Sequence, residues 1–580
     1  MASVWGELKR RNVVKVAVAY AIVGWLLVQV ADIFFPALQL PEWTVTLVAS
    51  LVVLGFPLAL ILSWAYELTP DGMERTKSVP LSETVTRVTG RKLDFVIIGL
   101  LVLVLGFVAV DQYVLEDSAG TLPNSVAVLP FENLSPDPDN AYFAAGIHEE
   151  ILDQLTKLSA LNVIARTSVL KYADGETSIP DIARELNVET VMEGSVRYAD
   201  DQVRIAAQLI DPETGAHLWS DVYQRDFADI FSIQADIAMN IANALEAEFS
   251  LEEQESIEKI PTESPTAYAF YLRARPHLGS WRSDLDRAIE LDPDFALAHA
   301  MKAYWRSWDL IGLAVGATTP EQALEIEQII YDSANQALAL DPTLGQAHAA
   351  LGFAHMANWR GADAEEAFQQ AYRLNPDADV AEMYGRFKRY RGEYDEAVRL
   401  GERSVQLDPA SFTRHNQLGI AYSRAGNYDA AATSLQSALV FNPTNAGTRT
   451  QLAFTEIARG NYDEALGHLE VVEQVAPGSF RFSQIVLAYG QMGRREDALR
   501  LFSVFEESAA QIPVGDAVWA RAYIGVGDNE QALQRLETAV GNRALTDFAV
   551  LTSFASNPWN DPVLNEPEFR ELLDGLWNDE

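Results

Sequence analysis

The sequence reads GEYDEA at residues 392–397, GNYDAA at 426–431 and GNYDEA at 460–465. The related stretches GRREDA at 493–498 and GDNEQA at 527–532 continue this series, with intervals of 33 or 34 residues between the leading glycines. In each stretch the glycine permits a turn between two helices, and the acidic residues suit the N-terminus of the second helix. The alanine at the end allows close contact between helices. A unit of two helices is therefore predicted to repeat about every 34 residues.

A second series, of prolines, marks the start of each unit. Five of these prolines follow an apolar-acidic or apolar-Asn pair, at Pro293, Pro342, Pro376, Pro409 and Pro443, and Pro477 follows Val475-Ala476. After a first interval of 49 residues, the spacing is 33 or 34. A 34-residue period resembles the tetratricopeptide repeat (TPR), in which each unit buries its apolar stripe only against its neighbours. The resemblance implies an all-α solenoid.

We expect this TPR helical repeat array to occupy residues 264–580. Five well-formed units are predicted between about 345 and 541. A degenerate pair at 264–340 contains an insertion near 312–319, and the tail NPWNDPVLNEPEFRELL has the character of a C-terminal cap.

The resemblance implies a concave groove lined by the first helix of each unit. Arg386, Arg389, Tyr390, Asn416 and Arg424 stand at groove-type positions in their units. Arginine and asparagine side chains there could clamp a carboxylate or a peptide backbone of a protein partner. The alternative is that they belong to ordinary solvated helix faces.

Three apolar segments near the N-terminus are long enough to be read as membrane spans. They cover about 13–35, 43–66 and 95–115, within a predicted three-span transmembrane region at 13–115. A bilayer core needs about 20 helical residues. The alternative, a cleaved signal peptide, fits poorly because the first apolar run is too long and two more follow.

Basic residues flank these segments unevenly, which predicts an orientation. Four Lys or Arg residues lie in 9–15 and five in 67–92, whereas none lies in 36–42 or between 93 and 156. We therefore expect the N-terminus, 1–12, and the loop 67–92 to be cytoplasmic. The protein would be a multi-pass protein of a bacterial inner membrane, in contact with the lipid bilayer, and residues after about 115 would be periplasmic.

Charge and cysteine content exclude several classes of function. Residues 1–115 hold nine basic and nine acidic residues, so the net charge of −39 belongs to the rest of the chain. So negative a surface repels nucleic-acid backbones. The chain has no cysteine, which excludes disulfides, thiolate zinc sites, iron–sulfur clusters and thiol nucleophiles.

Residues 122–249 show a mixed pattern of strands and helices. The order expected is βαβα, then three strands in an antiparallel meander, then a helix. The strands are predicted at 125–131, 161–165, 190–198, 202–210 and 217–223, and the helices at 141–158, 178–186 and 230–249. Residues 250–263 are expected to be a linker to the array.

The strings AVLPF, YFAAGIHEEILDQLTKL, VIARTS, IARELNV and VMEGSVRYADDQVRIAAQLIDPETGAHLWSDVYQRDF run through this region in order. They resemble the TolB-like domain, over about 125 residues. The resemblance implies an α/β domain that occurs in bacterial membrane proteins beside cyclase or winged-helix output modules, usually followed by TPRs. It supplies no catalytic residue.

Candidate chemistry in the chain is sparse. His148, Glu149 and Glu150 lack the second histidine of a zinc protease motif and are expected on a surface helix. His348 and His355 share a helix face but have no third ligand nearby in sequence. We therefore expect no enzyme: no catalytic residue, no metal site and no cofactor.

Two functions remain open. The first is a membrane-anchored, periplasm-facing sensory or protein-interaction scaffold that acts through the TolB-like domain and the array, as a monomer or homo-oligomer. The second is a transmembrane signalling subunit, related to receptor-type cyclases or transcription regulators, that lacks an output domain of its own. An enzyme hidden in the TolB-like region has no motif to support it.

Overall fold

The structure is a computed structural model that describes residues 121–136, 141–275, 280–313, 320–476, 481–511, 514–542, 545–556 and 561–577. Of the first 120 residues it describes 20, 24–25, 52, 55–56, 66–69 and 72–75. The chain separates into two units, Met1–Gly120 and Thr121–Glu580.

The first unit contains a short β-hairpin. Strand β1 (Tyr66–Thr69) pairs antiparallel with β2 (Gly72–Arg75). The hairpin overlaps the end of the expected span 43–66 and the start of the expected loop 67–92. The sequence Pro70-Asp71-Gly72, which leads from β1 into β2, is typical of a turn. A turn at this point allows the two strands to pair as a hairpin.

The predicted fold class, which includes three transmembrane helices, is wrong for the residues that the structure describes. Within the residues that the structure describes, no helix combines the length and the continuous apolar character needed to cross a bilayer. The segments 13–35, 43–66 and 95–115 lie almost wholly outside those residues. The described helices differ physically from spans because their apolar residues form one face. The 21-residue α13 (Pro320–Leu340), for instance, carries Glu325, Glu327 and Asp332.

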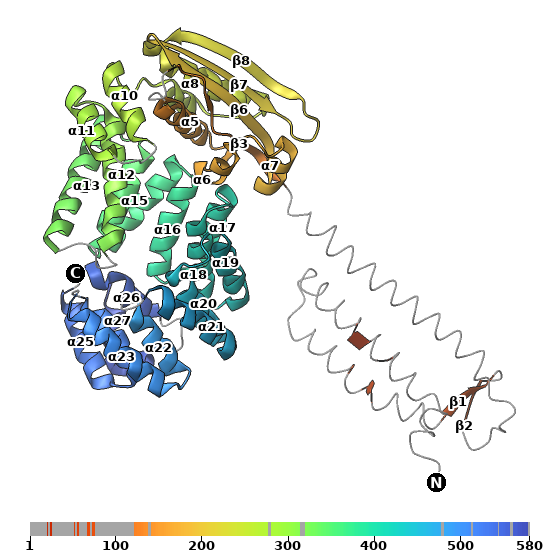
Figure 1. The fold of residues 1–580 in the computed structure, drawn as a ribbon, viewed down its shortest axis with the longest axis vertical. Helices are drawn as coiled ribbons and strands as arrows, with labels where there is room; N and C mark the ends of the chain where they lie inside the picture. The colour runs from red at the N-terminus through yellow and green to blue at the C-terminus, as the bar shows by residue number, and fades with distance from the viewer. Residues whose placement is uncertain are drawn as a thin grey trace. The chain divides into compact units, whose positions relative to one another are not determined.

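The expected location is corrected for the same reason. The predictions of a multi-pass inner-membrane protein, of later residues in the periplasm and of a lipid bilayer as partner all depended on those three spans. The described part of the chain is instead mostly a helical repeat array with a smaller sheet region (Figure 1).

The sheet region begins the second unit. Its strand order is β5-β3-β6-β7-β8, and β4 (Glu132–Asn133) pairs separately with β6. Pairing is parallel around β3 and antiparallel from β6 to β8, as expected for the meander. The strands are β3 (Leu122–Val128), β5 (Asn162–Val163), β6 (Val188–Ala199), β7 (Gln202–Ile210) and β8 (His217–Asp226).

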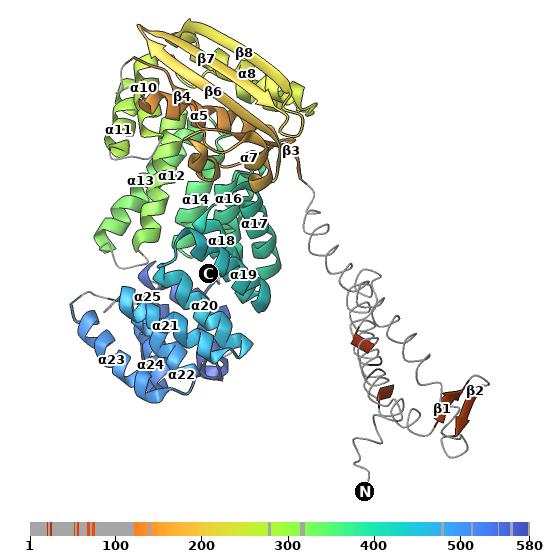
Figure 2. The same cartoon turned by 45° about the vertical axis from the view of Figure 1, so that its right-hand side comes forward.

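Helices cover this sheet on both faces near β3, because successive β3 residues point in opposite directions. Val126 and Val128 face a core shared with α5 (Ala141–Thr156) and α8 (Ile230–Ala244). Ala127 faces a smaller core, which is closed by α6 (Arg166–Val169) and α7 (Ile179–Leu186). Figure 2 shows α5 between the sheet and the array, so both sides of this helix are covered.

The remaining helices form the array, in consecutive antiparallel pairs from α10–α11 to α24–α25. We call the first helix of each pair the inner helix. After α9 (Leu251–Glu258), the helices are α10 (Pro265–Ala274), α11 (Trp281–Leu291), α12 (Ala296–Leu313), α13, α14 (Gly345–Ala357), α15 (Gly361–Leu374), α16 (Ala378–Tyr390), α17 (Tyr394–Leu407), α18 (Phe412–Arg424), α19 (Tyr428–Phe441), α20 (Ala446–Arg459), α21 (Tyr462–Val475), α22 (Phe482–Gln491), α23 (Arg495–Ala509), α24 (Asp516–Val526), α25 (Asn529–Asn542), α26 (Leu545–Ser556) and α27 (Pro567–Asp574).

The turns predicted at the repeating glycines are confirmed. Gly392, Gly426, Gly460, Gly493 and Gly527 all have φ between 71° and 82°, in the left-handed region that side chains disfavour. Each glycine lies between the two helices of a pair. The 34-residue period therefore records a backbone requirement that recurs once per unit.

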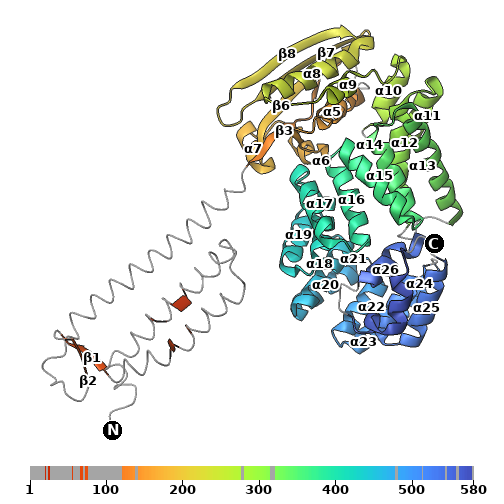
Figure 3. The same cartoon turned by 180° about the vertical axis from the view of Figure 1, so that it is seen from behind.

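The array also closes on itself. Helix α26 contacts the inner helices α16 and α24, although α16 lies far earlier in the chain (Figures 1 and 3). One continuous apolar core joins residues of α12–α16 to residues of α20–α27. In the described residues, α19 and α20 contribute a separate small cluster of Ala432, Leu435 and Leu452. The first and last parts of the array thus share a core through direct contact.

A second long-range contact fixes the sheet region to the array. The Ser168 hydroxyl donates to Asp408 Oδ1 at 2.7 Å and accepts from the Ala410 amide at 2.9 Å. The Ala165 amide donates to the Leu407 carbonyl oxygen at 2.7 Å. Helix α6 therefore docks on the turn between α17 and α18, and we call this contact the α6 joint.

Candidate functional site

The five predicted groove residues lie on two neighbouring inner helices. Arg386, Arg389 and Tyr390 belong to the C-terminal half of α16, and Asn416 and Arg424 belong to α18. All five side chains are half-buried. Position alone therefore agrees with a surface on the inner side of the array, and the contacts of each residue decide what it can bind.

Arg386 is already committed to an internal ion pair. Its Nε and Nη2 donate to Glu382 Oε1 at 2.9 and 2.6 Å, and its guanidinium lies 5.8 Å from the ring centroid of Trp308. Burial opposes the charge, but the carboxylate of Glu382 raises the pKa of Arg386 overall. This arginine is neutralised and held by the array itself.

Arg389 and Arg424 come close enough to repel each other. Arg389 Nη2 donates to Gln417 Oε1 at 3.1 Å, and its guanidinium lies 4.7 Å from the Tyr390 ring centroid. Arg424 Nη2 donates to the Ser553 hydroxyl at 2.6 Å. Burial, and next the charge of Arg389, lower the pKa of Arg424 to about 9. The two positively charged groups thus lie close together and form a cationic spot on the inner face.

Asn416 is turned toward the next unit. Its Oδ1 accepts a hydrogen bond from Thr448 Oγ1 at 2.8 Å, which links α18 to α20. The structure thus gathers Arg389, Tyr390 and Arg424, leaves Arg386 in its own ion pair, and gives Asn416 a role between units.

Residues that the sequence did not single out dominate this surface. The ring centroid of Phe548, on α26, lies 4.5 Å from the ring centroid of Trp359, 5.1 Å from that of Tyr390 and 5.7 Å from that of Trp577. Trp577 Nε1 donates to the Tyr390 carbonyl oxygen at 3.2 Å. We call these four rings the closure cluster. The inner face of α16 therefore already holds a helix, supplied by the tail of the same chain.

Part of the inner face stays open beside this tail. A cavity of about 680 Å³ lies among the C-terminal ends of α20, α22 and α24. Tyr428, Tyr462 and Arg495 line it, together with Gln491, which donates to Asp561 Oδ2 at 3.1 Å. This opening is large enough for side chains of a bound protein segment.

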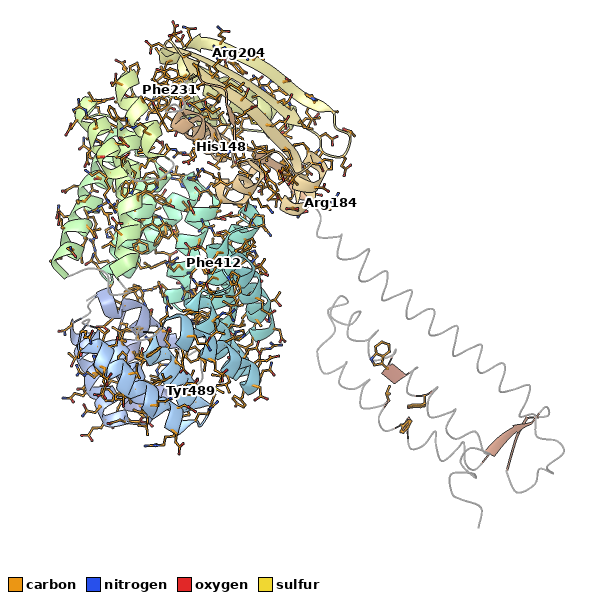
Figure 4. All side chains as sticks on the ribbon, in the orientation of Figure 1. His148, Arg184, Arg204, Phe231, Phe412 and Tyr489 are labelled. Carbon is orange, nitrogen blue, oxygen red and sulfur yellow. The ribbon has the colours of Figure 1, made fainter. Side chains whose placement is uncertain are left out.

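The expectation that His148, Glu149 and Glu150 lie on a surface helix is wrong, because α5 packs between the sheet and α10. Figure 4 labels His148 on this helix. His148 and Glu150 are 1% and 2% exposed. His148 Nε2 lies 2.9 Å from the Val128 carbonyl oxygen, and burial lowers its pKa to about 4. Glu149 pairs with Arg166 at 2.9 Å, and Arg275 contacts both glutamates at 3.3–3.4 Å. These groups hold α5 in place.

Comparison with known proteins supports the repeats. A model of the tetratricopeptide repeat family matches residues 422–487. Similar solved structures include YrrB, described as a TPR protein with an unusual peptide-binding site, at 18% identity over 33% of this chain and 92% of that chain, with a TM-score of 0.26. A tetratricopeptide repeat protein from Parabacteroides merdae covers 48% of this chain and 99% of its own, at 15% identity and a TM-score of 0.33.

One curated relative is a protein of Rhizobium meliloti (strain 1021) named "Putative adenylate cyclase 3". It is 40% identical over 219 residues, which are 36% of this chain. The chain spans 37% of the length of that relative. Together with the 34-residue period and the left-handed turn glycines, the family match shows that the chain contains a tetratricopeptide repeat array.

Proposed function

We propose that this protein is an interaction scaffold that binds helical protein segments on the inner face of its repeat array. The observation that carries the proposal is the seating of α26 on α16. A surface that holds a helix through aromatic rings and an arginine hydrogen bond has the chemistry to hold a similar helix from a partner. The opening beside it gives such a segment a place to enter.

The cationic spot adds a preference. Arg389 and Arg424 repel each other, so an acidic side chain from a partner would relieve that repulsion. A carboxylate also makes stronger hydrogen bonds to arginine than a hydroxyl does. The favoured partner is therefore a helical segment with an acidic residue, and α26 is its intramolecular competitor.

In vivo crosslinking followed by mass spectrometry tests this proposal. We expect the double variant Arg389→Gln and Arg424→Gln to lose a defined subset of the proteins that crosslink to the unchanged chain. Arg399→Gln is the matched control, because Arg399 lies on the outer helix α17 and is 58% exposed. If the double variant and the control give the same crosslinked proteins as the unchanged chain, the inner face is not the binding surface.

Folding of the double variant must be checked independently, since both arginines are half-buried. Its circular dichroism and melting temperature should stay close to those of the Arg399→Gln control. A second variant, Ser553→Asp, keeps both arginines and gives Arg424 an internal carboxylate. This variant should strengthen the self-contact and reduce partner crosslinking.

A second candidate function is that of a signalling subunit, which the similarity to the Rhizobium protein favours. In this view the TolB-like region, proposed at residues 122–249, and the array transmit the state of a bound partner to a separate output protein. Crosslinking would then recover a nucleotide cyclase or a transcription regulator. Recovery of other classes of protein alone would argue against this second function.

We further propose that the chain has no catalytic activity of its own. The buried ion pairs of Glu149 and Glu150 give these residues a structural role, which supports this reading. The purified chain should form no cyclic AMP from ATP with magnesium or manganese, and formation at a steady rate would overturn the statement.

A further inference from the structure

Strand β8 forms an edge of the sheet. It stands at the end of the strand order, after β7, and it lies at the outer side of the sheet in Figures 1 and 3. Its ten residues, HLWSDVYQRD, are exposed except for Trp219 and Tyr223. Leu218 and Val222 leave 45% and 50% of their surfaces exposed. A long edge strand with exposed apolar residues is a template for pairing with another strand.

Alternate backbone amides of β8 point away from β7. The Phe227 amide, just after the strand, donates to the Asp201 carbonyl oxygen at 2.8 Å and continues the ladder between β7 and β8. Because amides alternate along an antiparallel ladder, the even-numbered amides of 220–226 point to the open edge. The Val222 amide accordingly donates to a side chain, the carboxylate of Asp221, at 2.7 Å.

The charges along this edge match those of a second copy of the same strand. If two β8 strands pair antiparallel about a two-fold axis at Tyr223, Asp221 of each copy stands opposite Arg225 of the other. Val222 then stands opposite Gln224, so that even-numbered amides meet, as a hydrogen-bonded ladder requires. This register makes two reciprocal ion pairs, and a shift of two residues in either direction removes both.

The partners that these charged groups have within one copy can be exchanged. Arg225 Nη2 lies 3.7 Å from Asp236 Oδ2 on α8, and both side chains are about half exposed. Such a pair contributes little to stability. When two strands pair, the Val222 amide donates to the Gln224 carbonyl oxygen of the second copy. Asp221 is thereby released from that amide and can meet Arg225.

We propose that β8 is a dimerisation edge, at which two copies of this chain join their sheets through antiparallel β8 strands about Tyr223. The remaining charged residue of the paired stretch, Asp226, then faces the neutral Ser220 of the second copy. Residues 220–226 of each copy take part, whereas stable interfaces usually use about 20–30 residues a side. The dimer is therefore weak and depends on concentration. It uses no residue of the closure cluster and is independent of the proposed binding of helical segments.

The absence of cysteine from the chain allows a direct test of this register. Full chains that carry Val222→Cys would be mixed with full chains that carry Gln224→Cys and oxidised with copper phenanthroline. Opposed residues of an antiparallel ladder have Cα atoms about 4.5–5.5 Å apart, within the span of a disulfide. We expect a crosslinked dimer, in a yield that rises with concentration.

A mixture of Val222→Cys with Ser220→Cys is the matched control. These positions lie on the same strand and are also exposed, but they would stand four residues out of register, about 13 Å apart. The control mixture should therefore give little crosslinked dimer. Circular dichroism of each variant checks that exchange at these exposed positions leaves the fold unchanged.

Charge reversal tests the two ion pairs. Asp221→Arg or Arg225→Asp, introduced alone into both crosslinking chains, should lower the yield of dimer about threefold or more, since like charges then stand opposite each other. The two changes together restore complementary pairs and should recover the yield, which a local role of either residue would not explain. Arg197→Asp is the control, because Arg197 is exposed on β6 and β7 lies between β6 and the edge.

Two outcomes would overturn the proposal. The first is a crosslinking yield from Val222→Cys with Gln224→Cys no greater than that of the control mixture, with the unchanged chain sedimenting as a monomer at every concentration. This outcome would leave the edge to a strand of a different protein. The second is a yield from the doubly reversed chains that stays as low as that of the single reversals.

Discussion

Two glycines determine how closely α22 and α24 approach each other. A Cβ atom built on Gly490 would lie 2.2 Å from the Gly525 carbonyl oxygen, and one built on Gly525 would lie 2.6 Å from the Leu487 amide nitrogen. Both neighbours are backbone atoms, which cannot turn aside as a flexible side chain can. The inner helices of the last two units are therefore in direct backbone contact.

Gly490→Ala should accordingly destabilise the array by about 1–3 kcal/mol, the usual cost of overpacking. Gly467→Ala is the matched control, because Gly467 lies within α21 and a Cβ there meets nothing within 4 Å. This control should gain about 0.5–1 kcal/mol from helix propensity. Urea denaturation of both variants measures the difference, and equal effects would contradict the packing argument.

Glu149 predicts a pH dependence. Burial raises its pKa to about 7, above its ordinary value of 4.5. A carboxyl whose pKa is higher in the folded state stabilises that state fully below pH 4.5, and this contribution is lost as the pH rises through about 7. Glutamine does not titrate, so the Glu149→Gln variant does not lose this stabilisation as the pH rises. The variant should therefore gain stability relative to the unchanged chain between pH 5 and pH 8.

Denaturation midpoints at pH 5, 6, 7 and 8 would check this, with the exposed Glu176→Gln as control. His148 titrates in the opposite sense, since its lowered pKa makes its contribution fall as the pH drops below 6.5 toward about 4. That contribution is common to both chains and cancels in the comparison. A constant difference between Glu149→Gln and the unchanged chain at all four pH values would refute the prediction.

At the scale of residues, the sequence predicted features that recur in every unit, but not side-chain contacts that occur once. The turn glycines were predictable because the same backbone requirement appears every 34 residues. The five predicted groove residues lie on the inner helices α16 and α18, but their partners could not be predicted. The ion pair of Arg386 with Glu382 and the bond from Arg424 to Ser553 join groups whose proximity no period encodes. The burial of Glu150 was hidden because its partner Tyr271, on α10, lies more than a hundred residues later in the sequence.

Helix α26 is the element that most changes the interpretation of the array. Phe548 is buried in the closure cluster, whereas most of the array is held by contacts between consecutive helices. Removing its ring by Phe548→Ala should cost about 3–5 kcal/mol, as for other buried aromatic residues. The loss should fall on the contact between α26 and α16.

Hydrogen exchange with mass spectrometry can locate that loss. In Phe548→Ala, amide exchange should speed up in 545–556 and in the C-terminal half of α16, while β6 and β7 keep their protection. Val504→Ala is the control, a partly exposed residue on the outer helix α23. Uniform acceleration across the sheet region as well would show that α26 supports the whole unit and is not a separable element.

Elements near one another in sequence were the ones that could be predicted. The strands and helices of 122–249 follow the expected order, and the hairpin-linked strands β6 to β8 pair as a meander. The parallel pairing of β3 with both β5 and β6 was not specified, because the connecting segments allow more than one strand order. The contact of α26 with α16 was not predicted, because it depends on the superhelical path of all the units between them.

On the scale of the whole second unit, the α6 joint couples the sheet region to the array. Ser168→Ala removes a donor to the buried Asp408 carboxylate and an acceptor for the Ala410 amide. Loss of hydrogen bonds to buried groups costs about 1–3 kcal/mol. We expect the melting transition to split or broaden as the two parts lose their coupling, measured by scanning calorimetry.

Ser283→Ala serves as the control for that measurement, because Ser283 is exposed in the first turn of α11 and its hydroxyl donates locally to the Ser280 carbonyl oxygen at 2.9 Å. The control should melt as the unchanged chain does. A single transition of unchanged width in Ser168→Ala would mean that the α6 joint contributes little to the coupling.

The closure of the array has a consequence for the time course of synthesis. The bond from Trp577 to Tyr390 joins residues 187 apart. At the usual 5–20 residues per second of translation, α16 is made roughly ten to forty seconds before the residue that covers it. During that interval α26 and Trp577 do not yet cover the rings of Trp359 and Tyr390 or the neighbouring arginines Arg389 and Arg424. A newly made chain is thus most open to capture by a partner, or by a chaperone, before its last helix arrives.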